Sequence, residues 1–149
     1  MEVKKVLCAV DLEDTIAPSV EYAKMMASMT GASILVAYVI PSHTPYEDVY
    51  LSVNNQPNEV NNPNETIQKS MNALLAEQFA GMDATGVILV GRPSEELVKL
   101  AEEKGASLIV MGTHGRAGFD RLLFGSVAHE VVRAAPCPVM TVRPPMPKK

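Results

Sequence analysis

Five short apolar runs, each continuous rather than alternating, constrain the fold of this chain more than any other feature of its sequence. A strand with one face in water alternates apolar and polar residues, whereas a strand buried on both faces is apolar throughout. Continuous runs are therefore typical of parallel sheets that helices cover on both sides. The runs are VLCAV (6–10), ILVAYVI (34–40), VILV (87–90), LIVM (108–111) and VMTV (139–142).

The segments between these runs carry helical spacing and helix end signals. Asn62, Pro63 and Glu65 resemble a capping box with proline at the first helical position. Strands that alternate with helices predict an α/β fold, an open five-stranded parallel sheet with helices on both faces. The predicted helices begin near Asp14, Asn62, Pro93 and Ser126, the first runs to about Ser28, and the first three are closed by Gly31, Gly81 and Gly105.

A length of 149 residues predicts a single domain over residues 1–149. The exception to its regular pattern is the stretch 41–62, which contains three prolines and five asparagines. A loop of this length is usually either functional or disordered. We expect a long flexible loop here, and the sequence leaves open whether it is poorly ordered or serves as a lid or partner surface.

Charge and composition exclude several classes of protein. The net charge of −4 argues against binding to nucleic acid or to an acidic membrane. The longest apolar run, 34–40, is too short to span a bilayer, and charges at residues 2, 4 and 5 interrupt any signal peptide. Cys8 and Cys137 are too few and too far apart for a disulfide framework. We therefore expect a soluble cytoplasmic protein.

Glycines gather in the stretch GTHGRAGFDRLLFGS, residues 112–126, directly after the fourth apolar run. Gly112 and Gly115 would let the backbone approach a ligand closely, with its N–H groups pointing inward. Gly125 and Ser126 then open a helix, whose first turn offers unpaired N–H donors and a partial positive charge. Together these residues are suited to cradle an anion, most plausibly phosphates.

Each residue of this stretch also has a purely structural explanation. Gly112 could end a strand, Gly125 could allow a tight entry to the helix, and Ser126 could be a simple N-cap. Known motifs are absent: the P-loop and GxGxxG patterns do not occur, and HEVVR (129–133) has Arg133 where a zinc-binding histidine would stand. The sequence contains no catalytic residue or metal ligand that we would name.

The spacing Gly112-x2-Gly115-x9-Gly125-Ser126 resembles the ATP-binding signature of the universal stress protein family. The resemblance covers nearly the whole chain, through VKKVLCAVDLEDT, GRPSEELVKLAEEKGASLIVMGTHGR and APCPVMTVR. It implies a sheet in the order 3-2-1-4-5. The switch point would then lie between the first and fourth strands, so that Asp11 and Gly112 face each other across one crevice.

The resemblance also implies roles for individual residues. Asp11 and the backbone near Val39 would serve the adenosine, and the alternative is that Asp11 is only a turn or cap residue. His114 and Arg116 would add donors and positive charge near the phosphates, although Arg116 could instead pair with Asp120. Along the ribose and phosphate path would lie Met111, Gly112, Gly115, Gly125, Ser126 and Val127.

From this resemblance we expect an ATP-binding stress-response protein that acts as a nucleotide-dependent switch or binding module. The alternative is a slow ATPase or phosphotransferase at the same site. Phosphoryl transfer needs Mg²⁺ ligands and positioned cations. Because Asp11 is the one convincing acid near the crevice and no lysine follows the glycines, binding is favoured over catalysis. The family also implies a homodimer joined through the last strand, residues 138–142, whose apolar edge could pair with another chain.

Overall fold

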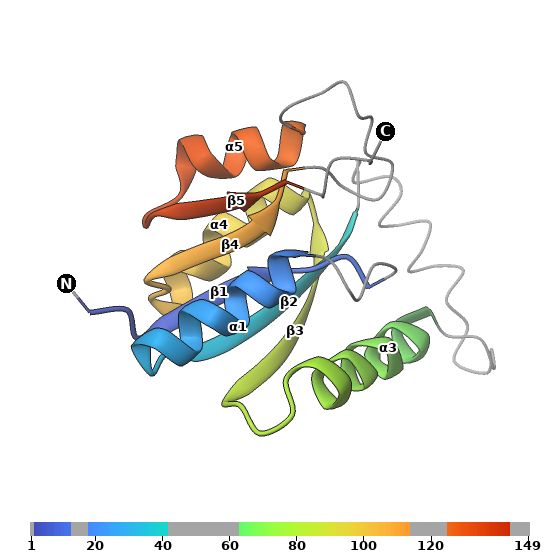
Figure 1. Ribbon diagram of the computed structural model, residues 1–149. Coiled ribbons are helices and arrows are strands. Elements are labelled where there is room, and N and C mark those ends of the chain that lie inside the picture. Colours follow the sequence, from blue (N-terminus) through green and yellow to red (C-terminus); the bar gives the residue numbers. More distant parts are fainter. Residues whose placement is uncertain (1, 13–17, 42–62, 114–124, 144–149) are drawn as a thin grey trace, which may run out of the picture.

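The computed structural model describes residues 2–12, 18–41, 63–113 and 125–143 (Figure 1). The positions predicted to cap the first two helices, Asp14 and Asn62, lie outside these residues, as does the predicted loop apart from Pro41. Strands and helices alternate as predicted: β1 (Lys5–Ala9), α1 (Pro18–Thr30), β2 (Ser33–Pro41), α3 (Pro63–Gln78), β3 (Ala84–Gly91), α4 (Pro93–Lys104), β4 (Leu108–Gly112), α5 (Ser126–Ala134) and β5 (Val139–Val142).

The described strands form one parallel sheet in the order β3-β2-β1-β4-β5, which confirms the predicted fold class. The central strand β1 is completely buried at Val6, Leu7 and Cys8, as its continuous apolar run predicts. The strand order reverses between β1 and β4, which pair with each other. From β1 the chain continues to β2 and β3 on one side of this pair, and from β4 it continues to β5 on the other side. In open α/β sheets a ligand crevice forms at such a switch point.

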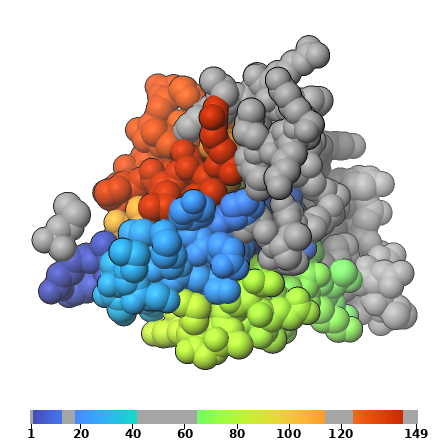
Figure 2. Space-filling model, in the orientation of Figure 1, coloured from blue at the N-terminus to red at the C-terminus, as the bar shows by residue number. Residues whose placement is uncertain are grey.

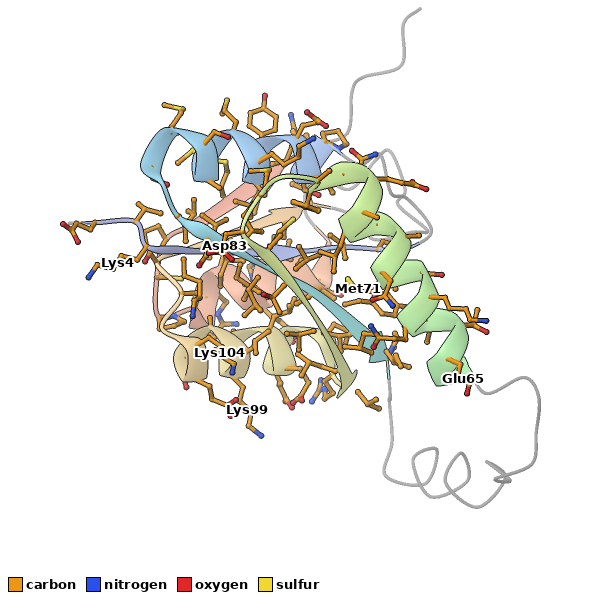
Figure 3. All side chains as sticks on the ribbon, turned by 90° about the horizontal axis from the view of Figure 1, so that it is seen from below. Lys4, Glu65, Met71, Asp83, Lys99 and Lys104 are labelled. Carbon is orange, nitrogen blue, oxygen red and sulfur yellow. The ribbon has the colours of Figure 1, made fainter. Side chains whose placement is uncertain are left out.

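Helices cover both faces of the sheet, and the side chains of β1 alternate between them. Val6 and Cys8 belong to the core on the side of α1 and α3, whereas Leu7 belongs to the core on the side of α4 and α5. Figure 3 shows both layers from below, with Met71 of α3 pointing toward the sheet and Lys99 of α4 pointing away from it. The molecule is therefore a three-layer sandwich with a core on each side of the sheet.

Glycines close the helices where the sequence predicts. Gly105 follows α4 in the left-handed conformation (φ 66°, ψ 42°), and the N–H of Ala106 donates to the carbonyl of Ala101 at 2.9 Å. Gly31 and Gly81 also have positive φ angles, although α3 itself ends at Gln78, a short turn before Gly81.

Strand β3 begins at Ala84, three residues before the predicted apolar run, because pairing with β2 extends it from Ile34 onward. Gly86 lies in this added part. A Cβ atom there would lie 2.6 Å from Cγ of Met71, so the glycine lets α3 pack closely on the sheet. Strand β4 likewise extends one residue further than predicted, to Gly112, which pairs with Val142.

Candidate functional site

The carboxyl ends of β1 and β4 lie side by side at the switch point. Cys8 is level with Val110, so the residues that follow β1 lead to Asp11 beside the end of β4 at Gly112. The N–H of Val10 donates to the carbonyl of Ala37 at 2.9 Å, which keeps the end of β1 aligned with β2. Asp11 is half-buried at this edge of the sheet.

Two predicted residues of the site, Val39 and Met111, have their side chains in the core. Val39 is 8% exposed and Met111 5% exposed, and both belong to the cluster on the side of α4 and α5. Their side chains therefore pack against other apolar groups, and the main chain of Met111 pairs with Thr141 of β5.

The start of helix α5 lies next to the end of β4 in space. The N–H of Gly125 donates to the carbonyl of Thr113 at 2.6 Å, and the N–H of Thr113 donates to the carbonyl of Val142 at 3.1 Å. These two bonds bring the start of the helix to the crevice across eleven intervening residues. The structure thus brings together Asp11, Gly112, Gly125, Ser126 and Val127 along one edge of the sheet.

Glycine occupies the N-cap of α5, and no side-chain cap hydrogen bond accompanies it. Ser126 is the first helical residue and is exposed, so the structural alternative in which Ser126 caps the helix is wrong. The N–H of His129 makes the first intrahelical bond, to Gly125 at 3.0 Å. The N–H groups of Ser126, Val127 and Ala128 precede it and have no intrahelical acceptor.

Charge distinguishes this helix from the others. The first turns of α1, α3 and α4 contain Glu21, Glu65 and the pair Glu95 and Glu96, which favour the positive end of a helix dipole. Among the helices that the structure describes, α5 alone has no acidic residue in its first turn. Within the described residues, the first turn of α5 therefore has no acid of its own to oppose an anion at these donors.

Thr113 is a residue that the sequence reasoning missed. It is 3% exposed, and its main chain joins the start of α5 to the end of β5. A β-branched residue directly after a buried strand was the available signal, because such a residue tends to continue the strand. Three other predicted residues, His114, Gly115 and Arg116, lie outside the described part of the chain.

A hollow of about 300 Å³ lies between α4 and α5. At its edge the hydroxyl of Ser94, in the first turn of α4, donates to the carboxylate of Glu130. The remaining lining residues are Glu95, Val98, Lys99, Glu102 and Ala134. Helix α5 thus supplies a carboxylate to the N-terminal turn of α4.

The two cysteines do not contribute a nucleophile to the crevice. Burial raises the pKa of the Cys8 thiol to about 12, and partial burial also raises the pKa of Cys137. Within the described ranges, no group of three or more His, Cys, Asp or Glu side chains could hold a metal ion. The same ranges contain no helix that is long and apolar enough to cross a membrane.

The sequence matches the universal stress protein family over residues 2–143, nearly the whole chain. The chain belongs to this family. It is 28% identical to universal stress protein MJ0577 of Methanocaldococcus jannaschii, with 94% of each chain covered. It is 30% identical to universal stress protein YxiE of Bacillus subtilis, with 93% of this chain and 98% of the relative covered.

Solved structures of universal stress proteins have the same fold. The structure of MJ0577 has a TM-score of 0.78 at 27% identity and covers 99% of this chain and all of its own. A universal stress protein in complex with cAMP has a TM-score of 0.68 at 23% identity, with coverage of 96% and 98%. One from Archaeoglobus fulgidus in complex with dAMP has a TM-score of 0.57 at 24% identity, with coverage of 95% and 98%.

Proposed function

We propose that this universal stress protein binds an adenine nucleotide, ATP in the first instance, in the crevice between β1 and β4. The observation that carries the proposal is the start of α5, a glycine cap with no side-chain cap hydrogen bond and no acidic residue in the first turn. An N-terminus of this kind suits a phosphate group. Two universal stress proteins of the same fold, solved with cAMP and with dAMP, support the choice of an adenine nucleotide.

In the proposed complex the nucleotide lies across the switch point. Asp11 and the main chain of Val39 contact the adenosine, and the main chains of Met111 and Gly112 line the ribose and phosphate path. The phosphates receive N–H groups from Ser126 and Val127 at the start of α5, and they pass close to the main chain of Gly125, whose own N–H donates to Thr113. Outside the described residues, Gly115 would add a further amide, and His114 and Arg116 would add donors and positive charge.

We further propose that the protein acts as a switch or binding module with little or no turnover. Phosphoryl transfer requires Mg²⁺ ligands, positioned cations and a group that orients the nucleophile. Of the described residues at the crevice, Asp11 is the one carboxylate. Any Mg²⁺ would then be held mainly by the nucleotide phosphates. A slow ATPase or phosphotransferase at the same site is the alternative.

Mass spectrometry of small molecules released from freshly purified protein tests the ligand directly, and we expect ATP, ADP or AMP. Titration calorimetry with ATP then measures the affinity, and ATP should raise the melting temperature. Absence of heat and of a thermal shift would overturn the proposal. Phosphate release measured at high protein concentration separates module from enzyme, because turnover of about 1 s⁻¹ or more would favour the alternative.

We also propose a cytoplasmic homodimer joined through the last strand, residues 138–142. Strand β5 is at the edge of the described sheet and is half-buried throughout, so a second copy could extend the sheet there. Both cysteines are free, as is usual in the cytoplasm. Sedimentation of the Thr141→Pro variant, which lacks one N–H in this strand, tests the dimer. The variant should sediment as a monomer, and a dimer of unchanged stability would contradict the interface.

A further inference from the structure

We propose, resting on the nucleotide binding proposed above, that a nucleotide at the start of α5 tightens strand β5 onto β4 through the main chain of Thr113. The occupied site would thereby control the edge of the sheet that a second copy of this chain can pair with.

Two hydrogen bonds on a single buried residue form the link. The carbonyl of Thr113 accepts the N–H of the Gly125 cap at 2.6 Å, and its own N–H donates to the carbonyl of Val142 at 3.1 Å. Thr113 is 3% exposed, so neither bond competes freely with water. A ligand that holds Gly125 in place therefore also holds Thr113, and with it the end of β5.

A ligand that restrains Thr113 should change the mobility of β5 more than that of any other described strand. Strand β5 has four residues, all half-buried, and the described sheet holds it on one side alone, by β4. The opposite edge strand, β3, pairs with β2 along eight residues. Figure 2 shows β5 at the surface beside α1.

The main-chain groups of β5 divide into two sets. The carbonyls of Pro138 and Val142 accept N–H groups from the chain of β4, so alternate residues of β5, including Met140, face β4. The N–H groups of Val139 and Thr141 consequently face the open edge. Tightening by a nucleotide protects the first set from exchange with solvent, whereas pairing with a second copy protects the second set. The two effects can therefore be measured separately in one strand.

Amide hydrogen exchange followed by NMR, with and without saturating ATP, tests the link. We expect exchange at Thr113, Met140 and Val142 to slow by about fivefold or more, the lower end of usual coupling between sites. Amides of β3 serve as the control and should change by less than about twofold. Bound ATP with equal changes at β5 and β3 would overturn the coupling. Protection at Val139 and Thr141 that rises with protein concentration reports pairing of copies instead.

Reciprocity supplies a second measurement, because loosening β5 must weaken nucleotide binding by up to the factor with which the nucleotide tightens β5. Met140→Ala on β5 and Ile88→Ala on β3 form a matched pair, since both side chains are half-buried and pack against the same core. We expect the dissociation constant of ATP to rise about threefold or more in Met140→Ala and by less than about 1.5-fold in Ile88→Ala. Equal increases would mean general destabilisation and would overturn the coupling.

Calorimetry on the unaltered protein distinguishes this failure from failure of the proposed function. If ATP does not bind, both proposals fall together. If ATP binds while the exchange rates of Thr113 and Val142 follow those of β3, nucleotide binding stands and the coupling alone is wrong.

Discussion

Helices α4 and α5 both begin at the carboxyl ends of the parallel strands, α4 after β3 and α5 after β4, yet the residues of their first turns differ. Helix α4 has proline at its first position and Glu95 and Glu96 in its first turn, and Ser94 there contacts Glu130 of α5. Helix α5 has a glycine cap and no acid. The described residues therefore satisfy the positive end of α4, whereas they supply no acid to that of α5, where we propose that a ligand binds. Under the proposed function, α5 has a weaker cap than an acidic residue would give, at the place where the phosphates approach.

The strongest test adds to α5 the acid that it lacks. Gly125→Asp should weaken ATP binding by about 100-fold, because a carboxylate at the cap occupies the N–H donors and repels the phosphates. The same side chain should raise the unfolding free energy of the protein by about 0.3 kcal/mol, since aspartate caps a helix only slightly better than glycine. Calorimetry and thermal melting measure the two effects.

Arg92→Asp is the matched control, because Arg92 holds the same cap position in α4. We expect ATP affinity to stay within about twofold of the unaltered protein, since this helix end is already satisfied by acids. Equal losses of affinity in the two variants would remove the distinction between the helices.

A second test compares a glycine that its backbone conformation requires, Gly91, with one that we propose a ligand requires, Gly125. Gly91 has φ 150°, which L side chains rarely adopt, and a Cβ there would lie 2.9 Å from Cγ of Glu96. Gly125 has an extended φ of −71° that any residue adopts. Gly91→Ala should therefore cost about 1–3 kcal/mol of unfolding free energy in urea and leave ATP affinity unchanged. Gly125→Ala should show the reverse pattern, and a reversed ranking of the two would contradict our interpretation of Gly125.

A third test concerns the residue opposite α5. If Asp11 accepts a hydrogen bond from the adenosine, Asp11→Asn should weaken ATP binding by about tenfold, the cost of one charge-assisted bond. Asp83→Asn is the control, because Asp83 is exposed and precedes β3 at the other end of the sheet (Figure 3). Inorganic triphosphate should bind Asp11→Asn and the unaltered protein equally. A loss of triphosphate affinity would place Asp11 at the phosphates instead.

The smallest expected effect is on the acids of α4. Glu95 pairs with Arg92 at 3.3 Å, and both side chains are about two-thirds exposed. Glu95→Gln should lower the unfolding free energy by about 0.5 kcal/mol or less, because exposed pairs are weak and salt screens them. The loss should shrink further in 1 M salt, and ATP affinity should not change. A larger loss that resists salt would show that α4 depends on this charge more than its exposure suggests.

Local patterns were enough to predict most of the architecture. Continuous apolar runs predicted parallel strands, because a strand covered on both faces has no position for a polar residue. The helix ends at Gly31 and Gly105 were predictable because a left-handed cap depends on one residue. Strand β3 was predicted too short, because Thr85 and Gly86 are not apolar and are held by pairing with β2 and by the approach of Met71.

Some features of the candidate site were likewise predictable from the sequence, and others were not. The sequence by itself determined which segments end in glycine and which strand carries Asp11, since these are properties of neighbouring residues. The residue that caps α5, the position of Thr113 between α5 and β5, and the burial of the Val39 and Met111 side chains depended on the tertiary structure. Each of these follows from contacts between residues far apart in the chain, and their geometry is set when the sheet and its helices pack together.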